Sequence, residues 1–372
     1  MTVRIGTRLT TALAALALAG LAVPAGAQDV PDYYPDDYDQ IIEASKAEDG
    51  LLIYSNMAQY NWAPVIEDFN KLYPWIEVST LDLDSDEVFN RYLAEAKTGA
   101  DTGDLLASAT PEGWLNVLDG GNIMEYESPE TAKVPEWSIP RPGVYTVSTD
   151  PMVLVWNDLV LPEELQPTGI ADLAEKIQAN PEVFEDSVST YSVTKSSYGQ
   201  AINAVYERAY PDTYWDMMKA IAPAVRPEVS SGPMLAKLQS GEYKTAYFIS
   251  GIVLFPKLDN AASAQIMDWT FIEDGTPLFQ RLMAVPTQSG SPNSAKLMLD
   301  FILSHDGQAA FGRGGLTPYR SGVTQDEVAF FTRDAIVEEV GEENLLLIGL
   351  DAQLVEEADA FREKWGDIFE GQ

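Results

Sequence analysis

The sequence predicts an α/β fold with two lobes, because short apolar strands alternate with amphipathic helices in two separate stretches. In the first stretch, Leu51–Tyr54 is an apolar run typical of a buried parallel strand, and helices and short strands follow it as far as Ala107. In the second, Met152–Trp156 predicts a strand, and the alternation continues to Ile249. Residues 119–150 between them are rich in Gly, Pro and polar groups, which suits a lid or a crossing between lobes.

The first 27 residues are interpreted as a cleaved export signal. Arg4 and Arg8 precede an uncharged apolar run, Ala12–Val23, and Ala25–Ala27 provides a small-x-small cleavage site. The run is shorter than the roughly 20 residues that a membrane-spanning helix needs. No Cys follows that could carry a lipid anchor. We therefore expect an exported protein that begins near Gln28, with an uncleaved N-terminal anchor as the alternative.

The chain is strongly acidic. When Arg4 and Arg8 leave with the signal, the 23 basic side chains become 21 against 58 acidic ones, so the formal charge moves from −35 to −37. Nucleic acid is not expected as a partner, because phosphates require a basic surface, and binding to anionic lipid is disfavoured for the same reason. Such a charge is typical of a soluble protein and does not reveal the sign of a ligand.

The residues needed for common kinds of catalysis are missing. The chain has no Cys and one His, His305, which lies in a polar stretch and is interpreted as an exposed residue at a helix end. G-x-S-x-G, H-E-x-x-H and P-loop motifs do not occur. A secreted carboxylate-dependent hydrolase remains the enzymatic alternative, although no acidic pair is singled out. A structural or adhesive protein is the third alternative, without the repeats that usually accompany it.

Four stretches of the chain resemble a known protein family. They read LLIYSNMAQYNWAPVIEDFNKLYPWIEV, RYLAEAKTGADTGDLLAS, MVLVWNDLVLPEE and SPNSAKLMLDFILSHDGQAAFGRGGLTPYRSGV. The last is similar to the family's closing signature of a helix, Ser-x-x-Gly-Gln and a Thr-Pro-x-Arg turn. In order and spacing they resemble the extracellular solute-binding proteins of bacterial ABC importers, in particular the ferric-iron group. That group also contains binders of phosphorylated sugars, phosphonates, thiamine and polyamine-like solutes.

The resemblance implies a two-lobed periplasmic-binding-protein fold of type II, with crossing strands as the hinge and the ligand in the cleft. Lobe 1 would be discontinuous, comprising residues 28–150 and 275–325, and lobe 2 would comprise residues 151–274. Independently of the resemblance, the residue pattern predicts a C-terminal helical segment at residues 326–372, most clearly over Ala352–Phe369. The implied protein is periplasmic, has no enzymatic activity or cofactor, and delivers a small molecule to an inner-membrane ABC permease. We expect it to be a monomer.

The ligands of the ferric binders are missing from the matching positions. Those relatives hold iron with a His after the first strand, a Glu after the third and two adjacent tyrosines in the second lobe. Here Ala58 and Ala109 stand where the His and Glu would fall, and Phe248–Gly251 occupies the tyrosine region, with Tyr247 alone before it. Iron is therefore an alternative and not the leading hypothesis.

Hydroxyl and amide side chains replace those ligands at strand ends and helix starts. Ligands of open α/β sheets bind at the carboxyl ends of strands, and helix N-termini there hold phosphate, phosphonate or carboxylate. We therefore predict a small anionic or zwitterionic solute, such as a phosphonate or a phosphorylated compound. Ordinary helix capping is the alternative role of these residues. The candidate ligand-binding residues are Ser55, Asn56, Ser108, Thr110, Trp114, Thr194, Ser196, Ser197, Tyr198, Ser230, Ser231 and Ser250.

Aromatic residues could also contribute to the cleft. Trp114 and Tyr198 follow polar strand-end turns and are expected in the cleft, whereas Trp156 and Trp215 are expected in the core. A cationic ligand, thiamine or a polyamine, is the second hypothesis within the family. It would need cleft carboxylates, and Glu112 is the nearest candidate.

Overall fold

The computed structural model describes residues 30–371, so the expected signal at residues 1–27 lies outside the described residues. From Pro35 onward the chain forms one compact unit. Within the described residues, no helix combines the length and apolar character needed to cross a membrane.

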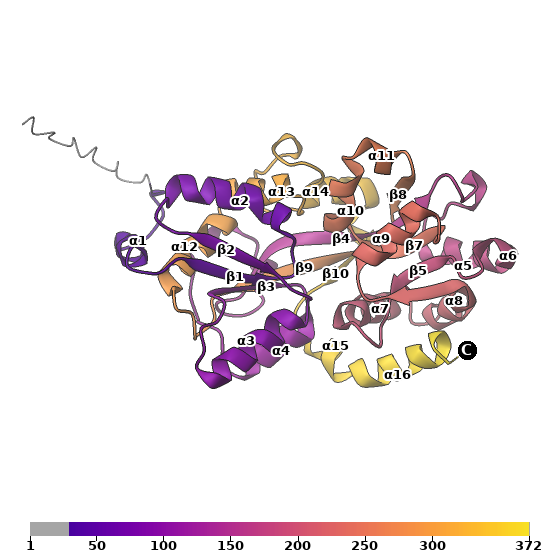
Figure 1. Cartoon of the computed structure of the whole chain (residues 1–372), viewed down its shortest axis with the longest axis horizontal. Helices are drawn as coiled ribbons and strands as arrows, with labels where there is room; N and C mark the ends of the chain where they lie inside the picture. Colours follow the sequence, from indigo (N-terminus) through magenta and orange to yellow (C-terminus); the bar gives the residue numbers. More distant parts are fainter. Residues whose placement is uncertain (1–29, 372) are drawn as a thin grey trace, which may run out of the picture. The chain divides into compact units, whose positions relative to one another are not determined.

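The sheet of the first lobe contains the parallel strands β2 (Val78–Asp82), β1 (Leu51–Ser55) and β3 (Leu105–Ser108), in that order. The helices of this lobe are α1 (Asp39–Ser45), α2 (Gln59–Leu72), α3 (Glu87–Thr98) and α4 (Pro111–Asp119). In Figure 1, α2 lies on one face of these strands, and α3 and α4 lie on the other. Four of the five β1 residues are buried, which agrees with the apolar run in the sequence.

Two long strands, β4 (Tyr145–Asn157) and β9 (Thr276–Ala284), connect the lobes. The first part of β4 pairs with β9, and from Met152 onward it pairs with β7 and β8. β4 begins seven residues before the strand that the sequence predicts, because its first part is polar. Those polar side chains are buried and bonded within the protein; for example, Ser148 Oγ donates to Asp150 Oδ2 at 3.1 Å. Residues 119–144 contain the short helices η1 (Pro129–Lys133) and η2 (Glu136–Ser138).

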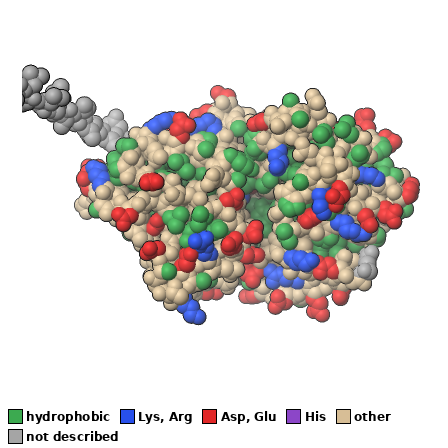
Figure 2. Space-filling model, in the orientation of Figure 1, with side chains coloured by type: hydrophobic (Ala, Val, Ile, Leu, Met, Phe, Trp, Pro, Cys, Tyr) green, Lys and Arg blue, Asp and Glu red, His purple; other side chains and the backbone are tan. Residues whose placement is uncertain are grey.

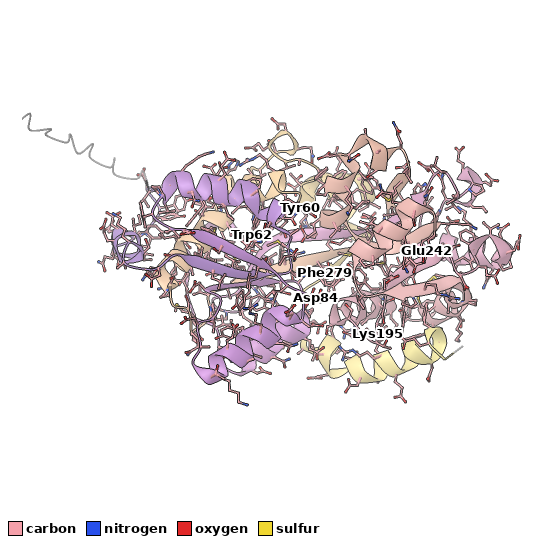
Figure 3. The ribbon with its side chains drawn as sticks, in the orientation of Figure 1. Tyr60, Trp62, Asp84, Lys195, Glu242 and Phe279 are labelled. Carbon is pink, nitrogen blue, oxygen red and sulfur yellow. The ribbon has the colours of Figure 1, made fainter. Side chains whose placement is uncertain are left out.

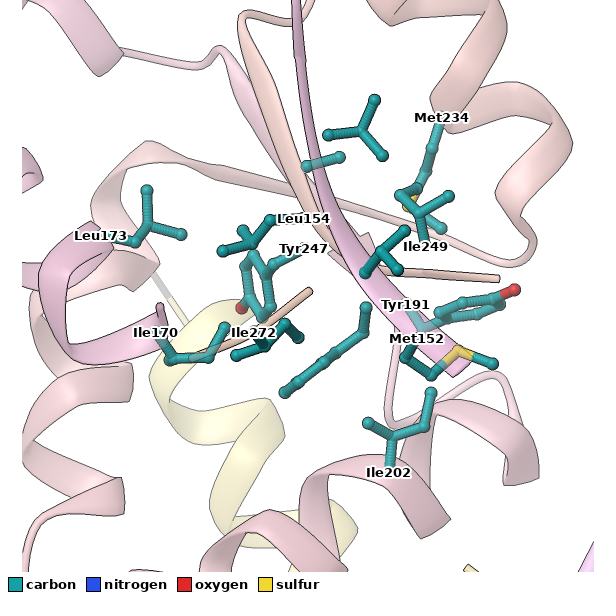
Figure 4. Packing of buried hydrophobic residues seen from close by; sticks show 14 of the residues in the cluster. Met152, Leu154, Ile170, Leu173, Tyr191, Ile202, Met234, Tyr247, Ile249 and Ile272 are labelled. Atoms are coloured by element: carbon teal, nitrogen blue, oxygen red, sulfur yellow. The ribbon is translucent and has the colours of Figure 1, made fainter. Parts of the chain in front are cut away.

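The second lobe has its own strands, with β7 (Thr245–Ser250), β5 (Val188–Tyr191) and β6 (Val225–Glu228) in parallel and β8 (Met267–Phe271) beside β4. Strand β6 has no apolar run that would predict it, because Val225–Glu228 includes a charge at each second position. The helices are η3 (Glu163–Leu165), α5 (Ile170–Ala179), α6 (Pro181–Phe184), α7 (Ser197–Ala209), α8 (Tyr214–Ile221), η4 (Ala222–Ala224), α9 (Ser231–Ser240), α10 (Gly251–Leu258) and α11 (Ala261–Ala264). Figure 4 shows apolar side chains of the strands and helices, including Met152 of β4 and Tyr247 and Ile249 of β7, packed in the core of this lobe.

The chain returns to the first lobe with α12 (Pro292–Leu303) and α13 (His305–Arg313), followed by η5 (Gln325–Glu327). His305 is the first residue of α13 and its side chain is 42% exposed, as expected for a residue at a helix end. The remaining elements are α14 (Arg333–Val340), η6 (Glu342–Asn344), β10 (Leu345–Ile348), α15 (Ala352–Glu356) and α16 (Ala358–Phe369). The helical prediction for this segment missed β10, which extends the sheet by pairing in parallel with β9.

Candidate ligand-binding cleft

A cavity of about 580 Å³ lies where the strand ends of the two lobes meet. Its walls come from the turn between β2 and α3, from the residues around the starts of α7, α9 and α10, and from Asn56 and Arg281. Figure 2 shows a hollow between the lobes with acidic side chains at its edge. In Figure 3, Asp84 and Lys195 are labelled on the two sides of this region, with Phe279 of β9 nearby.

A buried guanidinium, that of Arg281 in β9, contributes to the cavity lining although only 1% of the residue is exposed. Its Nε donates to Asp150 Oδ2 in β4 at 2.9 Å, and its Nη1 donates to Asn56 Oδ1. A buried charge is costly unless it is paired, and Asp150 supplies that pair from the other crossing strand. These two bonds use two of the five N–H groups of the guanidinium, which leaves donors for a ligand.

Two hydroxyl groups and a backbone N–H, from three different elements, meet on the second-lobe wall. Tyr191 OH lies 2.8 Å from Ser231 Oγ, and Ser231 Oγ also accepts the backbone N–H of Ser250 at 3.0 Å. Ser231 is the first residue of α9 and Ser250 immediately precedes α10. Burial raises the pKa of Tyr191 to about 12, so its phenol is protonated at neutral pH and can donate a hydrogen bond.

The start of α7 adds a third helix N-terminus to the same wall. Ser196 caps this helix by accepting the N–H of Gly199 at 3.2 Å, and Lys195 precedes it. Tyr198 stacks on Phe279 with ring centroids 3.9 Å apart, and burial raises its pKa well above the usual value. Free N–H groups and the helix dipole make each helix start slightly positive, so this wall favours an anion.

The first-lobe wall has the opposite charge. Asp82, Asp84, Asp86 and Glu87 line the cavity from the turn between β2 and α3. Burial, and then the neighbouring carboxylate of Asp84, raises the pKa of Asp82. Burial is also the largest cause of the raised pKa of Asp86, opposed by a hydrogen bond from Ser197. A nearby positive charge would stabilise the ionised form of these partly buried carboxyl groups. This wall therefore favours a cationic group of the ligand.

Half of the residues that the sequence analysis proposed for the ligand line this cavity. They are Asn56, Ser196, Tyr198, Ser230, Ser231 and Ser250. Each lies at the end of a strand or near the start of a helix, as the rule for open α/β sheets predicts.

Four of the other proposed residues lie inside the first lobe. Ser55 is fully buried and its Oγ accepts Trp62 Nε1 at 2.9 Å, while Ser108 Oγ donates to the carbonyl of Ser85 at 3.2 Å. Thr110 is fully buried at the start of α4. The placement of Trp114 in the cleft is wrong, because α4 turns the fully buried indole toward Phe89, at a centroid distance of 5.1 Å. Trp156 is buried and Trp215 packs partly buried against the second-lobe core, as expected.

The remaining two proposed residues bind carboxylates of the protein itself. Thr194 Oγ1 donates to Glu370 Oε1 at 2.6 Å. Ser197 Oγ lies 3.1 Å from Asp86 Oδ2 and 3.2 Å from Glu112 Oε2. The loop before α7, which carries the predicted ligand-binding residues Thr194, Ser196 and Ser197, therefore uses part of its hydroxyls for contacts within the chain. Glu112, the carboxylate proposed for a cationic ligand, forms an ion pair with Arg362 at 2.8 Å.

The charged residues of the cleft lining are absent from the residues predicted for the ligand. Arg281 could have been found, since it is a single charge inside the otherwise uncharged run Leu278–Val285. Asp82 ends β2 and the residues as far as Glu87 follow it, so the strand-end rule that selected Ser55 and Ser108 applies to them equally. In a strongly acidic protein, an acidic run is typical of ordinary solvated surface. Its residues therefore do not stand out in the sequence as part of a binding site.

The donors of a ferric site are not assembled in the described part of the chain. Within residues 30–371, no group of three or more His, Cys, Asp or Glu side chains is arranged to hold a metal ion. Tyr247 is fully buried in the second-lobe core and Ala109 is buried as well. A buried Arg281 in the cavity lining would also repel a trivalent cation.

Two α/β lobes, joined by crossing strands and enclosing a polar cleft, define a two-lobed ligand-binding protein. Residues 76–317 match the model of the bacterial extracellular solute-binding protein family, and the chain belongs to that family. It is therefore a solute-binding protein. No curated protein sequence matches the chain significantly.

Solved structures share this fold at low sequence identity. The substrate-binding protein of an ABC transporter from Agrobacterium tumefaciens has a TM-score of 0.77 at 20% identity, covering 86% of this chain and 95% of that one. AfuA from Actinobacillus pleuropneumoniae, with fructose-6-phosphate bound, has a TM-score of 0.69 at 16% identity over 86% and 98% of the two chains. An apo ferric ion-binding protein A from Pasteurella haemolytica has a TM-score of 0.65 at 17% identity, over 86% and 97%. These similarities confirm the type II periplasmic-binding-protein fold.

Proposed function

We propose that the cleft captures a small zwitterion, with a phosphonate, phosphate or carboxylate at one end and an ammonium group at the other. The observation that carries this proposal is the charge division of one cavity. A buried guanidinium and three helix starts contribute to it, while four carboxylates line it from the opposite lobe.

The anionic end of the ligand would bind at Arg281 and the second-lobe wall. Arg281 is held in orientation by Asp150 and Asn56, so little of its side-chain entropy is lost on binding. Its fork of donors matches the oxygens of a phosphonate or carboxylate. Ser230, Ser231 and the free N–H groups of α9 would supply further hydrogen bonds.

The ammonium end would bind beside Asp82 and Asp84 in the first lobe. Closing the lobes around a ligand removes water from these carboxylates, and an ammonium group would replace the lost hydration. A solute with both charges therefore contacts both lobes, and such a ligand stabilises the closed state.

The same acidic wall favours the second candidate, a cationic ligand such as thiamine or a polyamine. A purely cationic solute would leave Arg281 and the helix starts without an anion, which makes it the weaker candidate. The ferric alternative is weaker, because no set of metal-ligating side chains is assembled within residues 30–371. The hydrolase alternative would require turnover of glycoside panels by the purified protein, and we expect none.

We propose further that the protein is the solute-binding component of an ABC importer and delivers its ligand to a membrane permease. It works in the periplasm after removal of residues 1–27, binds without chemical conversion, acts as a monomer and has no nucleic-acid partner. Its lobe limits are residues 28–150 and 275–325 for lobe 1, residues 151–274 for lobe 2, and residues 326–372 for the C-terminal segment.

Calorimetric titration with matched solutes tests the ligand class. 2-Aminoethylphosphonate carries both charges, ethylphosphonate only the anion, and ethanolamine only the cation; spermidine, thiamine and ferric ion complete the set. We expect 2-aminoethylphosphonate to bind at least about tenfold more tightly than either singly charged compound, since each lost charge contact is worth about 1.5–3 kcal/mol. Tight binding of spermidine, thiamine or ferric ion without any binding of the phosphonates would refute the proposal.

The variant Asp84→Asn tests the ammonium end separately. We expect it to weaken 2-aminoethylphosphonate binding by about tenfold and to leave ethylphosphonate binding unchanged or slightly improved. Asp119→Asn is the matched control, because this substitution removes the same charge at an exposed position in the same lobe. Equal losses for the two ligands would place Asp84 outside the ammonium site.

A further inference from the structure

The last two helices of the chain pack against the second lobe. We use the name C-terminal strap for α15 and α16, residues 352–369. Trp365 and Phe369 belong to the second-lobe core and stack on each other with ring centroids 4.1 Å apart. Figure 1 shows the strap in yellow along α7 and α8 of that lobe. Polar contacts add to this attachment, since Gln200 Nε2 of α7 donates to the carbonyl of Leu354 at 3.1 Å.

The same strap also contacts the first lobe. Arg362 Nη2 in α16 lies 2.8 Å from Glu112 Oε2 in α4, and α15 packs against α4. The side chains of this ion pair are 23% and 35% exposed, so solvent only partly screens them. The strap therefore connects an element fixed on the second lobe with a carboxylate of the first.

A second contact between the lobes lies beside the first. Ser197 at the start of α7 has its Oγ within 3.2 Å of both Asp86 and Glu112. The carboxylate of Glu112 is one of the causes that raise the pKa of Asp86, while Ser197 and Arg362 act in the opposite direction. We call these four residues, Asp86, Glu112, Ser197 and Arg362, the closure cluster. Two first-lobe carboxylates that repel each other thus receive a hydroxyl and a guanidinium from the second lobe.

We propose that the C-terminal strap and the closure cluster form a latch that holds the two lobes closed. Arg362 and Glu112 do not line the cavity, so they act on ligand affinity as positioning residues through closure. When only part of the population is binding-competent, the apparent dissociation constant rises in proportion to the missing fraction. The inference rests on the binding function of the cleft and not on the zwitterionic nature of the ligand.

Distance measurements between the lobes test the latch without any ligand. Since the chain contains no Cys, spin labels can be attached uniquely at Lys97→Cys in α3 and Lys219→Cys in α8, both exposed and one in each lobe. Double electron–electron resonance on the ligand-free mature protein should show a shift to longer distances in Arg362→Gln and in Glu112→Gln. The charge-swapped double variant Glu112→Arg/Arg362→Glu should return most of the population to the shorter distance.

Arg226→Gln is the matched control, because Arg226 pairs with Asp186 inside the second lobe and spans no lobe boundary. Unchanged distances in both latch variants would overturn the proposal, and so would equal opening in the control. Titration of the latch variants with 2-aminoethylphosphonate should give a dissociation constant about two- to tenfold higher than that of the parent. Absence of binding by the parent would refute the proposed ligand class, while the distances would still decide the latch.

Discussion

At the scale of single residues, the buried pair of Arg281 and Asp150 joins the two crossing strands at the cleft. Both side chains are almost fully buried, with exposures of 1% and 0%, so neither charge is stable without the other. Such pairs add little net stability compared with apolar residues, but breaking them is costly. The Arg281 side chain also lines the cleft cavity, which agrees with a role in binding.

Replacing Arg281 alone should therefore damage both stability and binding. We expect Arg281→Met to lower the free energy of unfolding by about 3–5 kcal/mol, because Asp150 is left as an uncompensated buried charge. The double variant Arg281→Met/Asp150→Asn should recover most of that loss without recovering phosphonate binding. Urea denaturation and calorimetry measure the two effects. If the double variant also bound the phosphonate, Arg281 would not be the anion anchor.

A second buried charge, Asp300 in α12, makes stability depend on pH. Tyr38 and Tyr126 each donate to its Oδ2 at 2.7 Å, and burial raises its pKa from 3.8 to about 7. Because the pKa is higher in the folded state, the protonated carboxyl is favoured on folding. The contribution of the protonated Asp300 carboxyl group to the free energy of unfolding is fully present below about pH 4. It is lost as the pH rises from about 4 to about 7.

The variant Asp300→Asn removes this titration and keeps the acceptor for the two tyrosines. Relative to the parent, its free energy of unfolding should improve by about 4 kcal/mol between pH 4 and pH 8, which corresponds to a shift of about three pKa units. Urea denaturation at several pH values compares the two proteins. Parallel pH profiles would show that Asp300 does not titrate in this range.

At the scale of elements, the C-terminal segment contributes more than the sequence suggests. β10 adds a strand beside β9, and α16 inserts Trp365 into the second-lobe core. The strand was missed because Leu345–Ile348 is short and stands between helical patterns, so only its pairing partner reveals it. Helical periodicity correctly indicated α16, whose apolar side chains face one direction.

Truncating Trp365 should show how firmly the strap is attached. We expect Trp365→Ala to lower the free energy of unfolding by about 3–5 kcal/mol through loss of contacts and creation of a cavity. Trp75→Ala is the comparison, since Trp75 is 37% exposed and should cost considerably less. Thermal or urea denaturation measures both variants. Equal costs would mean that the strap is not docked in the core.

At the scale of the whole molecule, the formal charge of −35 is large for a chain of 372 residues. Repulsion among the carboxylates opposes the compact state, and salt screens it. The melting temperature should therefore rise as NaCl increases from about 10 mM to about 1 M, where the screening length falls from about 30 Å to about 3 Å. KCl should act equally, because screening does not depend on the cation. A falling melting temperature would show that specific ion pairs outweigh the repulsion.

The extent of prediction differs between the fold and the cleft. Strand–helix alternation identified both lobes, because hydrophobic periodicity reflects which side of each element is buried. Strand ends and helix starts indicated six of the residues that line the cavity, because the carboxyl ends of parallel strands converge. The direction of each side chain was not accessible in this way. Ser108 is the last residue of β3 and Trp114 lies in the helix that follows, yet both side chains are fully buried.

By itself, then, the sequence determined the α/β class, the two lobes and the polar character of the cleft, since these follow from local periodicity and from residue type at strand ends. Only the tertiary structure decided that Arg281 lies opposite Asp82 and Asp84 and that Arg362 reaches Glu112. These residues are far apart along the chain, and their meeting depends on how the crossing strands and the last helix bring the lobes together. Local sequence periodicity does not indicate which distant residues meet, because charge pairing across a cleft depends on how the lobes pack.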